Sequence, residues 1–402
     1  MTNYHVMCKF NQKFLYLLIK FFVVLFLYYY IIMNLLDVID KKYIMQKSLD
    51  KIKENISVSS KPGMLIASPS LDPPYKYHWI RDSAVVMRVF INDYQTTKSK
   101  ESLLLLIDYI NNEYEIQNLD TIGSLGEPKI NLNGTAFDGP WGRPQNDGPA
   151  LRGSNMIKLY NLLLNDYNSI CKNIILPIIK KDLNYILNNY NKVCFDLWEE
   201  QEGWHFYTRM VQFKFLKDSI DMIHDNKLSY NKDVLNKAIF NLSNSIKHHY
   251  QGDVIISSFN SDGEITKVDD AANLFAYTHI DYDEKILKIF PIEKTLKTCD
   301  NLHSFFNKKY ETSELNMIGR YAHDKYYDGQ TWIICSLVAA QIYTHLNNNN
   351  EAVNDIINTI LEIDLNLDIS EQYNPITKEQ MSAKKLTWNY AELYSTLKLS
   401  LR

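Results

Sequence analysis

The stretch AVVMRVFINDY, residues 84–94, indicates the fold class of this 402-residue chain. Its apolar side chains recur at the three- and four-residue spacing of an α-helix. The same spacing returns in residues 101–116, 150–164, 174–190, 232–248, 331–346, 352–363 and 386–399, with loops between them. Past residue 36 we find no good run of alternating polar and apolar residues that would indicate a strand. We therefore expect an all-α domain built from stacked helix pairs.

Composition and charge narrow the class of protein. A chain that is 46% hydrophobic over 402 residues can bury a large core, and a barrel of this size can fold as one unit. The formal net charge of −4 is small and spread out, so no basic stripe indicates a nucleic-acid partner. The widely spaced cysteines form no C-x-x-C pair, which argues against a zinc site: Cys8, Cys171, Cys194, Cys299 and Cys335. We expect buried thiols, with one disulfide among the last four as the alternative.

The N-terminus predicts membrane attachment. Residues 14–32 are apolar apart from a single lysine, and about 20 apolar residues span a bilayer. Because the run ends in tyrosines and isoleucines rather than small residues, we expect an uncleaved signal-anchor, with Lys9 and Lys13 on the cytosolic side. Residues 1–35 would be the tail and anchor, and residues 36–402 a luminal, vacuolar or extracellular domain. Secretion after cleavage is the alternative. Three glycosylation sequons fit either route: Asn55, Asn133 and Asn241.

Glycine, proline and tryptophan mark the region expected to carry function. Seven of the 13 glycines and four of the 11 prolines fall within residues 123–153, so we predict a long ordered loop there. The six tryptophans stand next to charged or polar residues: Trp79, Trp141, Trp198, Trp204, Trp332 and Trp388. An aromatic ring packs on the apolar face of a pyranose while charged groups bond its hydroxyls. The pattern therefore predicts a sugar-binding pocket.

Five segments hold the candidate site residues: YKYHWIRD (75–82), FDGPWGRPQNDGPALR (137–152), FDLWEE (195–200), IGRYAHDKYYDG (318–329) and SEQYNPIT (370–377). Arg81 and Asp82 either clamp sugar hydroxyls or form an ion pair at a helix N-terminus. Asp147 either binds a ligand or caps a helix. Arg320 and Asp324 are predicted to hold sugar hydroxyls.

Two of these segments offer carboxyl groups for acid–base chemistry. Glu199 and Glu200 follow a tryptophan between apolar flanks, and an apolar pocket keeps such an acid protonated until a leaving oxygen takes the proton. The competing interpretation is a solvated glutamate pair on a helix surface. Glu371 precedes Pro375 and a tryptophan-bearing helix, which could direct it into a cavity; otherwise it is a surface acid. His323 is expected to be a surface or core histidine rather than a catalyst.

Together the segments closely resemble the motifs of glycoside hydrolase family 15, the glucoamylases, and its fungal members in particular. The matching fragments are GMLIASPS (63–70), WIRD (79–82), GEPK (126–129), WGRPQNDGPALR (141–152), DLWEE (196–200), GRY (319–321) and LTW (386–388). They follow the family order across residues 36–402. The resemblance implies an (α/α)6 barrel with its active site in a funnel at one end.

The resemblance also implies residue roles. Glu199 matches the general acid and Glu371 the general base of an inverting exo-hydrolase that releases β-D-glucose from non-reducing ends of α-1,4-glucans: starch, glycogen and maltooligosaccharides. Ser382 matches a residue that supports the base. The matched substrate-binding positions are Tyr75, Trp79, Arg81, Asp82, Trp141, Arg143, Asp147, Asp196, Glu200, Arg320 and Trp332. No metal or organic cofactor is implied. We expect a monomer that contacts the glucan and, through its N-terminal segment, the membrane.

Three residues depart from the family pattern. Thr331 stands where proline is usual, His323 where glutamate is usual and Asp328 where asparagine is usual. Residues 332–371 also form a shorter stretch than in fungal relatives, which bears on rate and subsite depth more than on reaction type. Because no starch-binding segment follows Arg402, we expect soluble glucan rather than raw granules as substrate. The alternatives are an enzyme for dextran or trehalose and a membrane-tethered glucan-binding protein without catalysis, against which the two carboxylates argue.

Overall fold

A computed structural model describes residues 20, 26, 38, 40–56, 58–59, 61–312, 315–347 and 350–401. The predicted signal-anchor, residues 14–32, falls almost entirely outside them. Among the described residues, no helix combines the length and the apolar character needed to cross a membrane.

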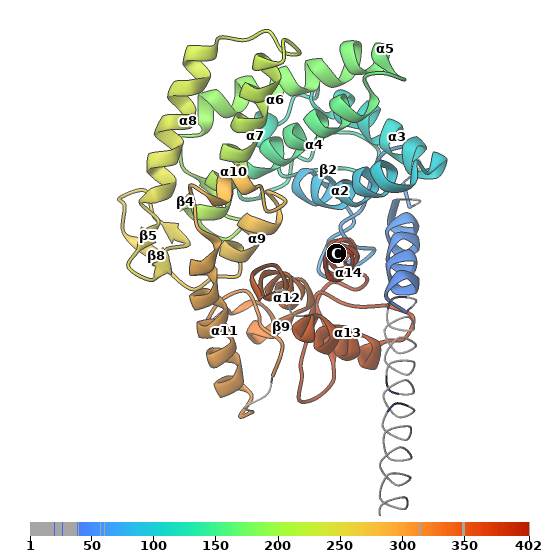
Figure 1. Cartoon of the computed structure of the whole chain (residues 1–402), viewed down its shortest axis with the longest axis vertical. Helices are drawn as coiled ribbons and strands as arrows, with labels where there is room; N and C mark the ends of the chain where they lie inside the picture. The colour runs from blue at the N-terminus through green and yellow to red at the C-terminus, as the bar shows by residue number, and fades with distance from the viewer. Residues whose placement is uncertain are drawn as a thin grey trace, which may run out of the picture.

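Six helices of the described chain form a closed inner ring. They are α2 (Ile80–Thr97), α4 (Asp147–Leu163), α7 (Phe206–His224), α9 (Ala272–Thr278), α12 (Ile333–Asn347) and α14 (Thr387–Ser400). Each packs against the next, and α14 returns to α2. Figure 1 looks nearly along α12 and α14, which stand side by side in the ring. In α12 every residue from Ile333 to Ile342 is buried, so this helix is enclosed on all its faces.

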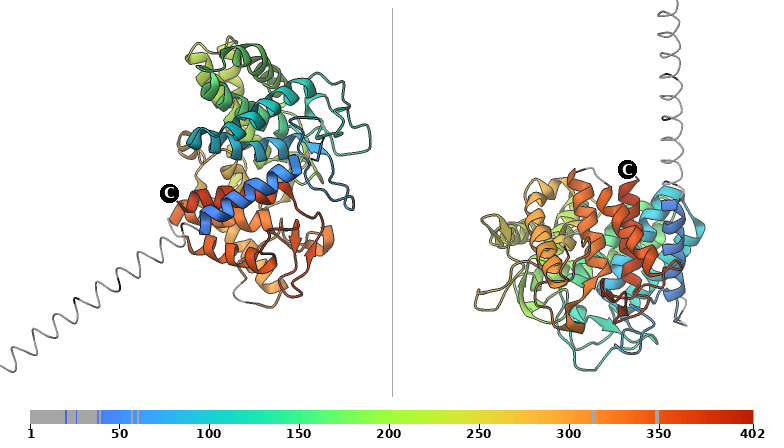
Figure 2. Two further views of the ribbon diagram at one scale, coloured as in Figure 1. Left: turned by 90° about the vertical axis from the view of Figure 1, so that its right-hand side faces the viewer. Right: turned by 90° about the horizontal axis from the view of Figure 1, so that it is seen from below.

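Six further helices of the described chain lie outside the ring, one before each inner helix. They are the helical residues 40–56, α3 (Lys100–Ile116), α6 (Leu176–Asn189), α8 (Lys232–Lys247), α11 (Thr295–Lys309) and α13 (Glu351–Ile363). Outer helices bury one stripe; in α8 it consists of Leu235, Ala238, Leu242 and Ile246. The expected barrel of six helix pairs is therefore confirmed (Figure 2).

Short elements fill the connections. The helical turns are η1 (Ser124–Gly126), α5 (Asn168–Ile170), η2 (Cys171–Ile175), α10 (Glu284–Leu287), η3 (Ile292–Lys294) and η4 (Tyr326–Gly329). The strands are β1 (His78–Trp79), β2 (Lys129–Ile130), β3 (Cys194–Phe195), β4 (Glu202–His205), β5 (Tyr250–Gln251), β6 (Val254–Ile255), β7 (Ser258–Phe259), β8 (Ile265–Lys267), β9 (Thr331–Trp332), β10 (Gln372–Tyr373) and β11 (Gln380–Met381). They pair antiparallel in the orders β1–β2, β3–β4–β7–β8, β5–β6 and β11–β10–β9. Because β1, β4 and β9 run directly into α2, α7 and α12, these strands edge the barrel end where inner helices begin.

The eight predicted helices are confirmed, and the described chain holds four long or ring-forming helices that the pattern did not reveal. These are the helix at residues 40–56, α7, α9 and α11. Burial around most of α7 and all of α9 removes the apolar stripe by which a helix is recognised. The strands were not predicted because two to four residues are too few to show the alternation of polar and apolar residues.

The predicted loop over residues 123–153 is wrong in its last part, because α4 begins at Asp147. Pro149 lies in the first turn of α4, where its missing N–H leaves no helical hydrogen bond unmade. Gly153 allows α4 to approach α7, because a Cβ there would stand 2.4 Å from the Phe215 ring. Pro149 and Gly153 therefore belong to helix α4 and not to the predicted loop.

The burial of the cysteines and of the sequon asparagines bears on the expected thiols and glycosylation sites. The described cysteines are buried free thiols, as expected: Cys171, Cys194, Cys299 and Cys335. The sequon at Asn55 is not an accessible acceptor, because Asn55 is 4% exposed and its side-chain amide donates to Thr387 Oγ1 at 2.8 Å. Asn133 and Asn241 are exposed. Only the latter two of the three sequons can therefore carry a glycan in the folded chain.

Candidate active site

A cavity of about 410 Å³ lies at the barrel end where the inner helices begin. Both predicted catalytic residues and most predicted binding residues line it: Tyr75, Trp79, Arg81, Asp82, Trp141, Glu199, Glu200, Arg320, Trp332 and Glu371. They come from the connections before the inner helices and from the first turn of α2. The barrel thus gathers segments that are almost 300 residues apart in sequence.

Glu199 is held from two sides by N–H donors. Trp79 Nε1 donates to Glu199 Oε1 at 2.8 Å, and an Arg81 nitrogen donates to the same oxygen at 3.1 Å. Trp141 Nε1 donates to Oε2 at 2.5 Å. The residue lies between β3 and β4 with a positive φ of 66°, and 15% of its side chain stays exposed. The carboxyl is therefore fixed in orientation and still open to a ligand.

Asp196 shapes the turn that carries Glu199. Asp196 Oδ1 accepts hydrogen bonds from the backbone N–H groups of Glu200 at 2.8 Å and Gln201 at 3.1 Å. Its other oxygen lies 3.1 Å from Lys267 Nζ. Burial raises the pKa of Asp196, but the charge of Lys267, reinforced by these backbone bonds, outweighs burial and lowers that pKa overall. A charged Asp196 therefore holds the loop from behind.

Glu371 lies deeper, directly before β10, with 2% of its surface exposed. Ser382 Oγ donates to Glu371 Oε2 at 2.5 Å. The Tyr326 hydroxyl lies 3.1 Å from Ser382 Oγ, and the Tyr75 hydroxyl lies 3.3 Å from that of Tyr326. Burial raises the pKa of Glu371 to about 7, against the bond from Ser382 and the charge of Arg320. Ser382 is thus hydrogen-bonded to the carboxyl that the resemblance implies it supports.

Arg81 and Asp82 lie in the first turn of α2 but have different surroundings. Arg81 donates through both terminal nitrogens to Gln145 Oε1, at 2.7 and 2.8 Å, and pairs with Asp147 Oδ2 at 3.2 Å. Asp82 lines the cavity, where burial raises its pKa to about 7 against the Arg81 charge. Within the described residues, Arg81 Nε is a buried donor without a protein acceptor. The alternative of an Arg81–Asp82 ion pair thus gives way to the Arg81–Asp147 pair.

Arg320 presents a second buried guanidinium to the cavity. Its Nε and one terminal nitrogen bond both oxygens of Asp324, at 2.8 and 2.7 Å. The same terminal nitrogen donates to Glu200 Oε1 at 2.7 Å. The Trp332 ring lies 4.9 Å from the guanidinium carbon. These contacts fix the plane of the cation beside the aromatic wall.

Four predicted binding residues stand behind the cavity lining rather than in it: Arg143, Asp147, Asp196 and Asp324. Asp147 and Asp324 each hold one of the lining arginines. Arg143 Nε donates to the buried Glu127 carboxylate at 2.7 Å. Asp147 and Asp324 thus orient side chains that face the cavity, and Asp196 holds the backbone of the turn that carries Glu199 and Glu200.

Three aromatic residues of the lining are not among the substrate-binding positions that the resemblance implies: Trp198, Tyr326 and Trp388. Trp198 and Trp388 stand inside the DLWEE and LTW fragments, so their place in those motifs was the available signal. Five of the six tryptophans line the cavity, as the sugar-pocket prediction expects. Trp204 does not, because it lies on β4 with its ring 4.8 Å from the Arg209 guanidinium carbon. His323 is exposed and packs edge-on against Phe305, consistent with a surface role.

Lys129, from the GEPK fragment, places a buried cation behind the rings that hold Glu199. Its Nζ lies 3.1 Å from the centroid of the Trp141 ring and 4.6 Å from that of Trp79. Burial lowers the pKa of Lys129 to about 8, against the attraction of the Glu199 charge. Lys129 stands in a fragment that matches the family, but its contacts with the two tryptophan rings could not be predicted from the sequence.

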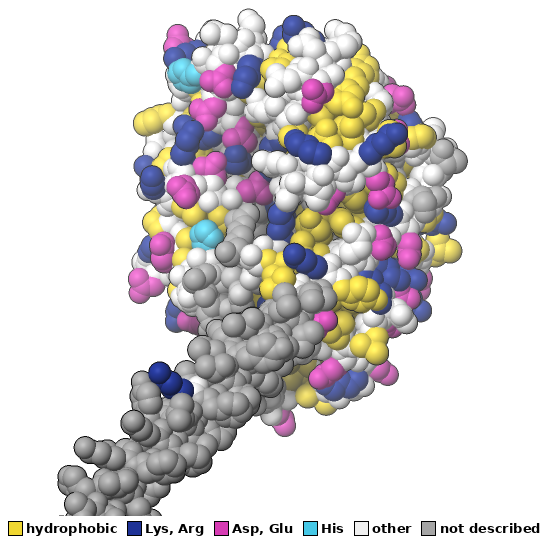
Figure 3. Space-filling view, turned by 45° about the vertical axis from the view of Figure 1, so that its right-hand side comes forward, with side chains coloured by type: hydrophobic (Ala, Val, Ile, Leu, Met, Phe, Trp, Pro, Cys, Tyr) yellow, Lys and Arg dark blue, Asp and Glu magenta, His cyan; other side chains and the backbone are white. Residues whose placement is uncertain are grey.

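The described residues outside the cavity bear on two other kinds of site, a metal centre and a charged binding patch. The described residues contain no group of three or more His, Cys, Asp or Glu side chains placed to hold a metal ion. On the face shown in Figure 3, positive and negative side chains are interspersed among hydrophobic ones. That face therefore carries no extended patch of one sign.

The fold and the site define a class: an (α/α)6 barrel that carries a pair of carboxyl groups in an aromatic pocket at one end. A family model described as "Glycosyl hydrolases family 15" matches residues 42–363, and the chain belongs to this family. Glu199 lies inside the matched stretch and Glu371 just after it.

Curated relatives are fungal glucoamylases. Glucoamylase-1 of Arthroderma benhamiae is 30% identical over 334 residues, which cover 76% of this chain and 52% of the relative. Glucoamylase 1 of Rhizopus oryzae is 33% identical over 304 residues, 71% of this chain and 50% of the relative. The chain thus spans about half the length of these relatives.

Solved structures show the same fold. A family 15 glucoamylase from Hypocrea jecorina superposes with a TM-score of 0.78 at 24% identity, covering 88% of this chain and 70% of that one. The glucoamylase of Saccharomycopsis fibuligera gives a TM-score of 0.73 at 23% identity, covering 90% and 94%.

Proposed function

We propose that the chain is an inverting exo-hydrolase that releases β-D-glucose from the non-reducing ends of α-1,4-glucans. The observation that carries the proposal is the placement of Glu199 and Glu371 on one aromatic-lined cavity. Glu199 is the general acid and Glu371 the general base. The family relationship supports the same substrate class.

The proposed reaction needs one proton donor and one proton acceptor. Glu199 gives its proton to the glycosidic oxygen as the bond from that oxygen to the anomeric carbon breaks. Glu371 takes a proton from a water molecule that attacks the same carbon from the opposite face. The N–H groups of Trp79, Arg81 and Trp141 fix the orientation of the Glu199 carboxyl at the cavity wall. Attack from the opposite face inverts an α-linkage to a β-product.

The buried charges at the inner end of the cavity favour attack on chain ends. Arg81, Asp82 and Arg320 are each under 10% exposed and line the cavity. Such groups bond the hydroxyls of a terminal glucose, and an internal residue would push the next sugar into them. Removal of single terminal units follows.

The anomer of the first product tests this proposal directly. Early proton NMR spectra of maltoheptaose digests are expected to show β-glucose first, followed by slow mutarotation to the α-anomer. The matched control is the same digest after mutarotation is complete. The appearance of α-glucose first, or of maltose as the main product, would contradict inverting exo action.

The acid side of the pH profile reports on Glu371. A base must be charged, so kcat/KM falls as pH drops through the raised pKa of this carboxyl. Ser382→Ala removes a donor that favours the charged form, so the pKa rises further and the acid limb moves to higher pH. Activity relative to wild type should be lowest at acid pH and recover as pH rises.

The measurement is kcat/KM against pH for wild type and Ser382→Ala. Ser395→Ala is the matched control, because that hydroxyl bonds the Ala391 carbonyl of its own helix. It should leave the acid limb in place. An unmoved limb in Ser382→Ala, or a shift to lower pH, would show that Ser382 does not support the base.

The membrane anchor over residues 14–32 remains part of the proposal, as do a monomeric state and a luminal, vacuolar or extracellular location of the catalytic domain. The apolar run beyond Lys13 supports the anchor. Resistance of the protein to carbonate washing of membranes tests it; release into the wash would contradict it.

A further inference from the structure

Glu392 is a fully buried carboxyl that the proposed chemistry does not use. It lies on α14, one helical turn after Trp388, and is 0% exposed. Trp388 lines the catalytic cavity, and its Nε1 donates to Glu392 Oε1 at 3.0 Å. The carboxyl therefore stands directly behind one wall of the cavity.

Side chains from other inner helices converge on the same carboxyl. His279, which follows α9, places Nε2 3.0 Å from Oε1. Gln341 of α12 donates to Oε2 at 2.9 Å, and Arg88 of α2 reaches Oε1 at 3.4 Å. The Tyr207 hydroxyl of α7 lies 2.8 Å from His279 Nδ1. Glu392 thus joins five of the six inner helices through one hydrogen-bonded cluster.

The charges of this cluster are matched. Burial raises the pKa of Glu392, but the hydrogen bond from His279 and the charge of Arg88 outweigh it and lower that pKa to about 2. Burial lowers the pKa of His279, so its ring is neutral. A neutral ring can donate from Nε2 to Glu392 and accept at Nδ1 from Tyr207. Glu392 is therefore a charged acceptor with Arg88 as its counter-ion.

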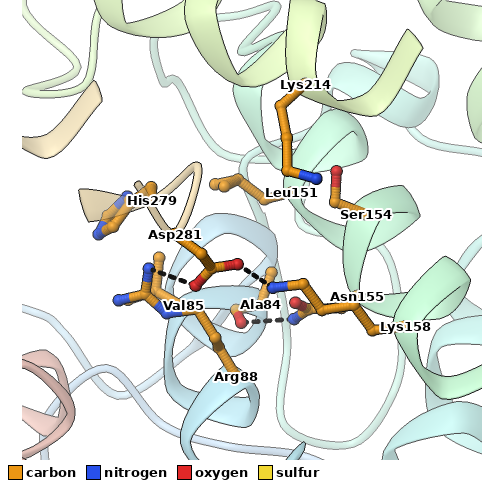
Figure 4. Close-up of a pocket in the computed structure, with 10 residues that line it drawn as sticks. All are labelled: Ala84, Val85, Arg88, Leu151, Ser154, Asn155, Lys158, Lys214, His279 and Asp281. Carbon is orange, nitrogen blue, oxygen red and sulfur yellow. Dashed lines mark hydrogen bonds and ion pairs between the residues drawn. The ribbon is translucent and has the colours of Figure 1, made fainter. Parts of the chain in front are cut away.

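The far side of Arg88 is held as well (Figure 4). One terminal nitrogen donates to the Thr278 carbonyl at 2.6 Å and lies 3.7 Å from Asp281, which pairs with Lys158 of α4. The hollow between these residues measures about 10 Å³, enough for about one water molecule and far too small for a sugar. Arg88 is therefore held on one side by Thr278 and Asp281 and on the other by Glu392.

The other contacts of Trp388 lack direction. Its ring lies 5.3 Å from that of Phe275 and 5.6 Å from that of His279, between centroids. Such ring contacts allow the indole to tilt, whereas an N–H bond to a fixed carboxylate does not. The Nε1 bond to Glu392 is thus the contact that sets the plane of this cavity wall.

We infer that Glu392 is a positioning residue for the proposed reaction, because it fixes the Trp388 indole against the sugar at the end of the chain. The inference rests on the proposed function only for the expected loss of kcat/KM. The placement of the indole can be measured without turnover.

The test compares Glu392→Met, Glu392→Gln and the matched control Gln341→Met. Gln341→Met removes a bond to the same carboxyl from the other side and leaves the Trp388 bond in place. For Glu392→Met we expect kcat/KM for maltotriose to fall, and the dissociation constant of glucose to rise, on the order of tenfold. The near-ultraviolet circular dichroism of the tryptophans should change as well. Glu392→Gln keeps an acceptor for Trp388 and should restore most of each value, and Gln341→Met should change each value much less than Glu392→Met does.

Several outcomes would overturn the inference. Folded Glu392→Met with wild-type glucose affinity and dichroism would do so, as would equal losses in Gln341→Met, which would indicate a purely structural role. If Glu392→Met does not fold, Arg88→Met combined with Glu392→Met removes both charges together and is read in the same way. If the wild-type chain binds glucose but does not hydrolyse maltotriose, the proposed function fails, while glucose affinity and dichroism still decide the role of Glu392.

Discussion

Glu199→Gln is expected to lower kcat/KM for maltotriose by about 10²–10⁴-fold, the range typical of a lost general acid. Glutamine keeps the size of the side chain, and its one amide oxygen can accept from the N–H group of Trp79 or of Trp141, which bond different oxygens of the wild-type carboxyl. It cannot give a proton to the glycosidic oxygen. The variant should therefore bind substrate nearly normally and fail at the chemical step.

α-Glucosyl fluoride separates this role from others. Fluoride leaves without being protonated, so Glu199→Gln should lose much less activity on this substrate than on maltotriose. Glu202→Gln is the matched control, because Glu202 is exposed on β4, three residues along the chain. It should leave both activities unchanged. Equal losses on the two substrates would mean that Glu199 does not act as the acid.

The ring architecture could be predicted in part because its outer members are amphipathic. The stripe of α8 is visible in the sequence, since one face of that helix meets water. α9 meets none, and its seven residues carry no contrast between faces. α12 was recognised by its unbroken apolar character and by its length. A helix can thus be recognised in the sequence where one of its faces is exposed to solvent.

The active site could be predicted from the sequence motifs more readily than from the chemistry of single residues. From residue types alone, Glu199 and Glu371 were at least as easily surface acids as catalysts. Their pairing depends on a barrel that places Glu371 directly before β10, whose Gln372 pairs with Trp332 of β9, and only the resemblance carried that information. Long-range placement of this kind has no local signal.

The division between lining and supporting residues also needed the structure. Asp82 and Asp147 each begin or nearly begin an inner helix, and both stand in the matched motifs. Asp82 lines the cavity, whereas Asp147 pairs with Arg81 behind it. Which aspartate faces the sugar depends on the rotation of α2 and α4 about their axes.

Glu371→Ala is expected to lower kcat/KM for maltotriose by about 10²–10⁴-fold, and α-glucosyl fluoride should not escape the loss. Water still has to be deprotonated as it attacks, whichever group leaves. The methyl side chain also leaves space where the carboxyl stood, deep in the cavity and 2% exposed in the wild type. The expected loss on α-glucosyl fluoride distinguishes this variant from Glu199→Gln.

Azide should restore turnover in Glu371→Ala, because this small anion fits the vacated space and attacks without giving up a proton. The bond to the leaving oxygen breaks as Glu199 protonates it, and azide forms the new bond from the opposite face, giving β-glucosyl azide. Glu379→Ala, on the exposed turn between β10 and β11, is the matched control and should neither lose activity nor respond to azide. Formation of α-glucosyl azide, or near-normal hydrolysis by Glu371→Ala, would show that Glu371 is not the base. Both variants lose activity on maltotriose, but only Glu371→Ala also loses activity on α-glucosyl fluoride and only it is rescued by azide, so the pair of experiments assigns each carboxyl its own step in the reaction.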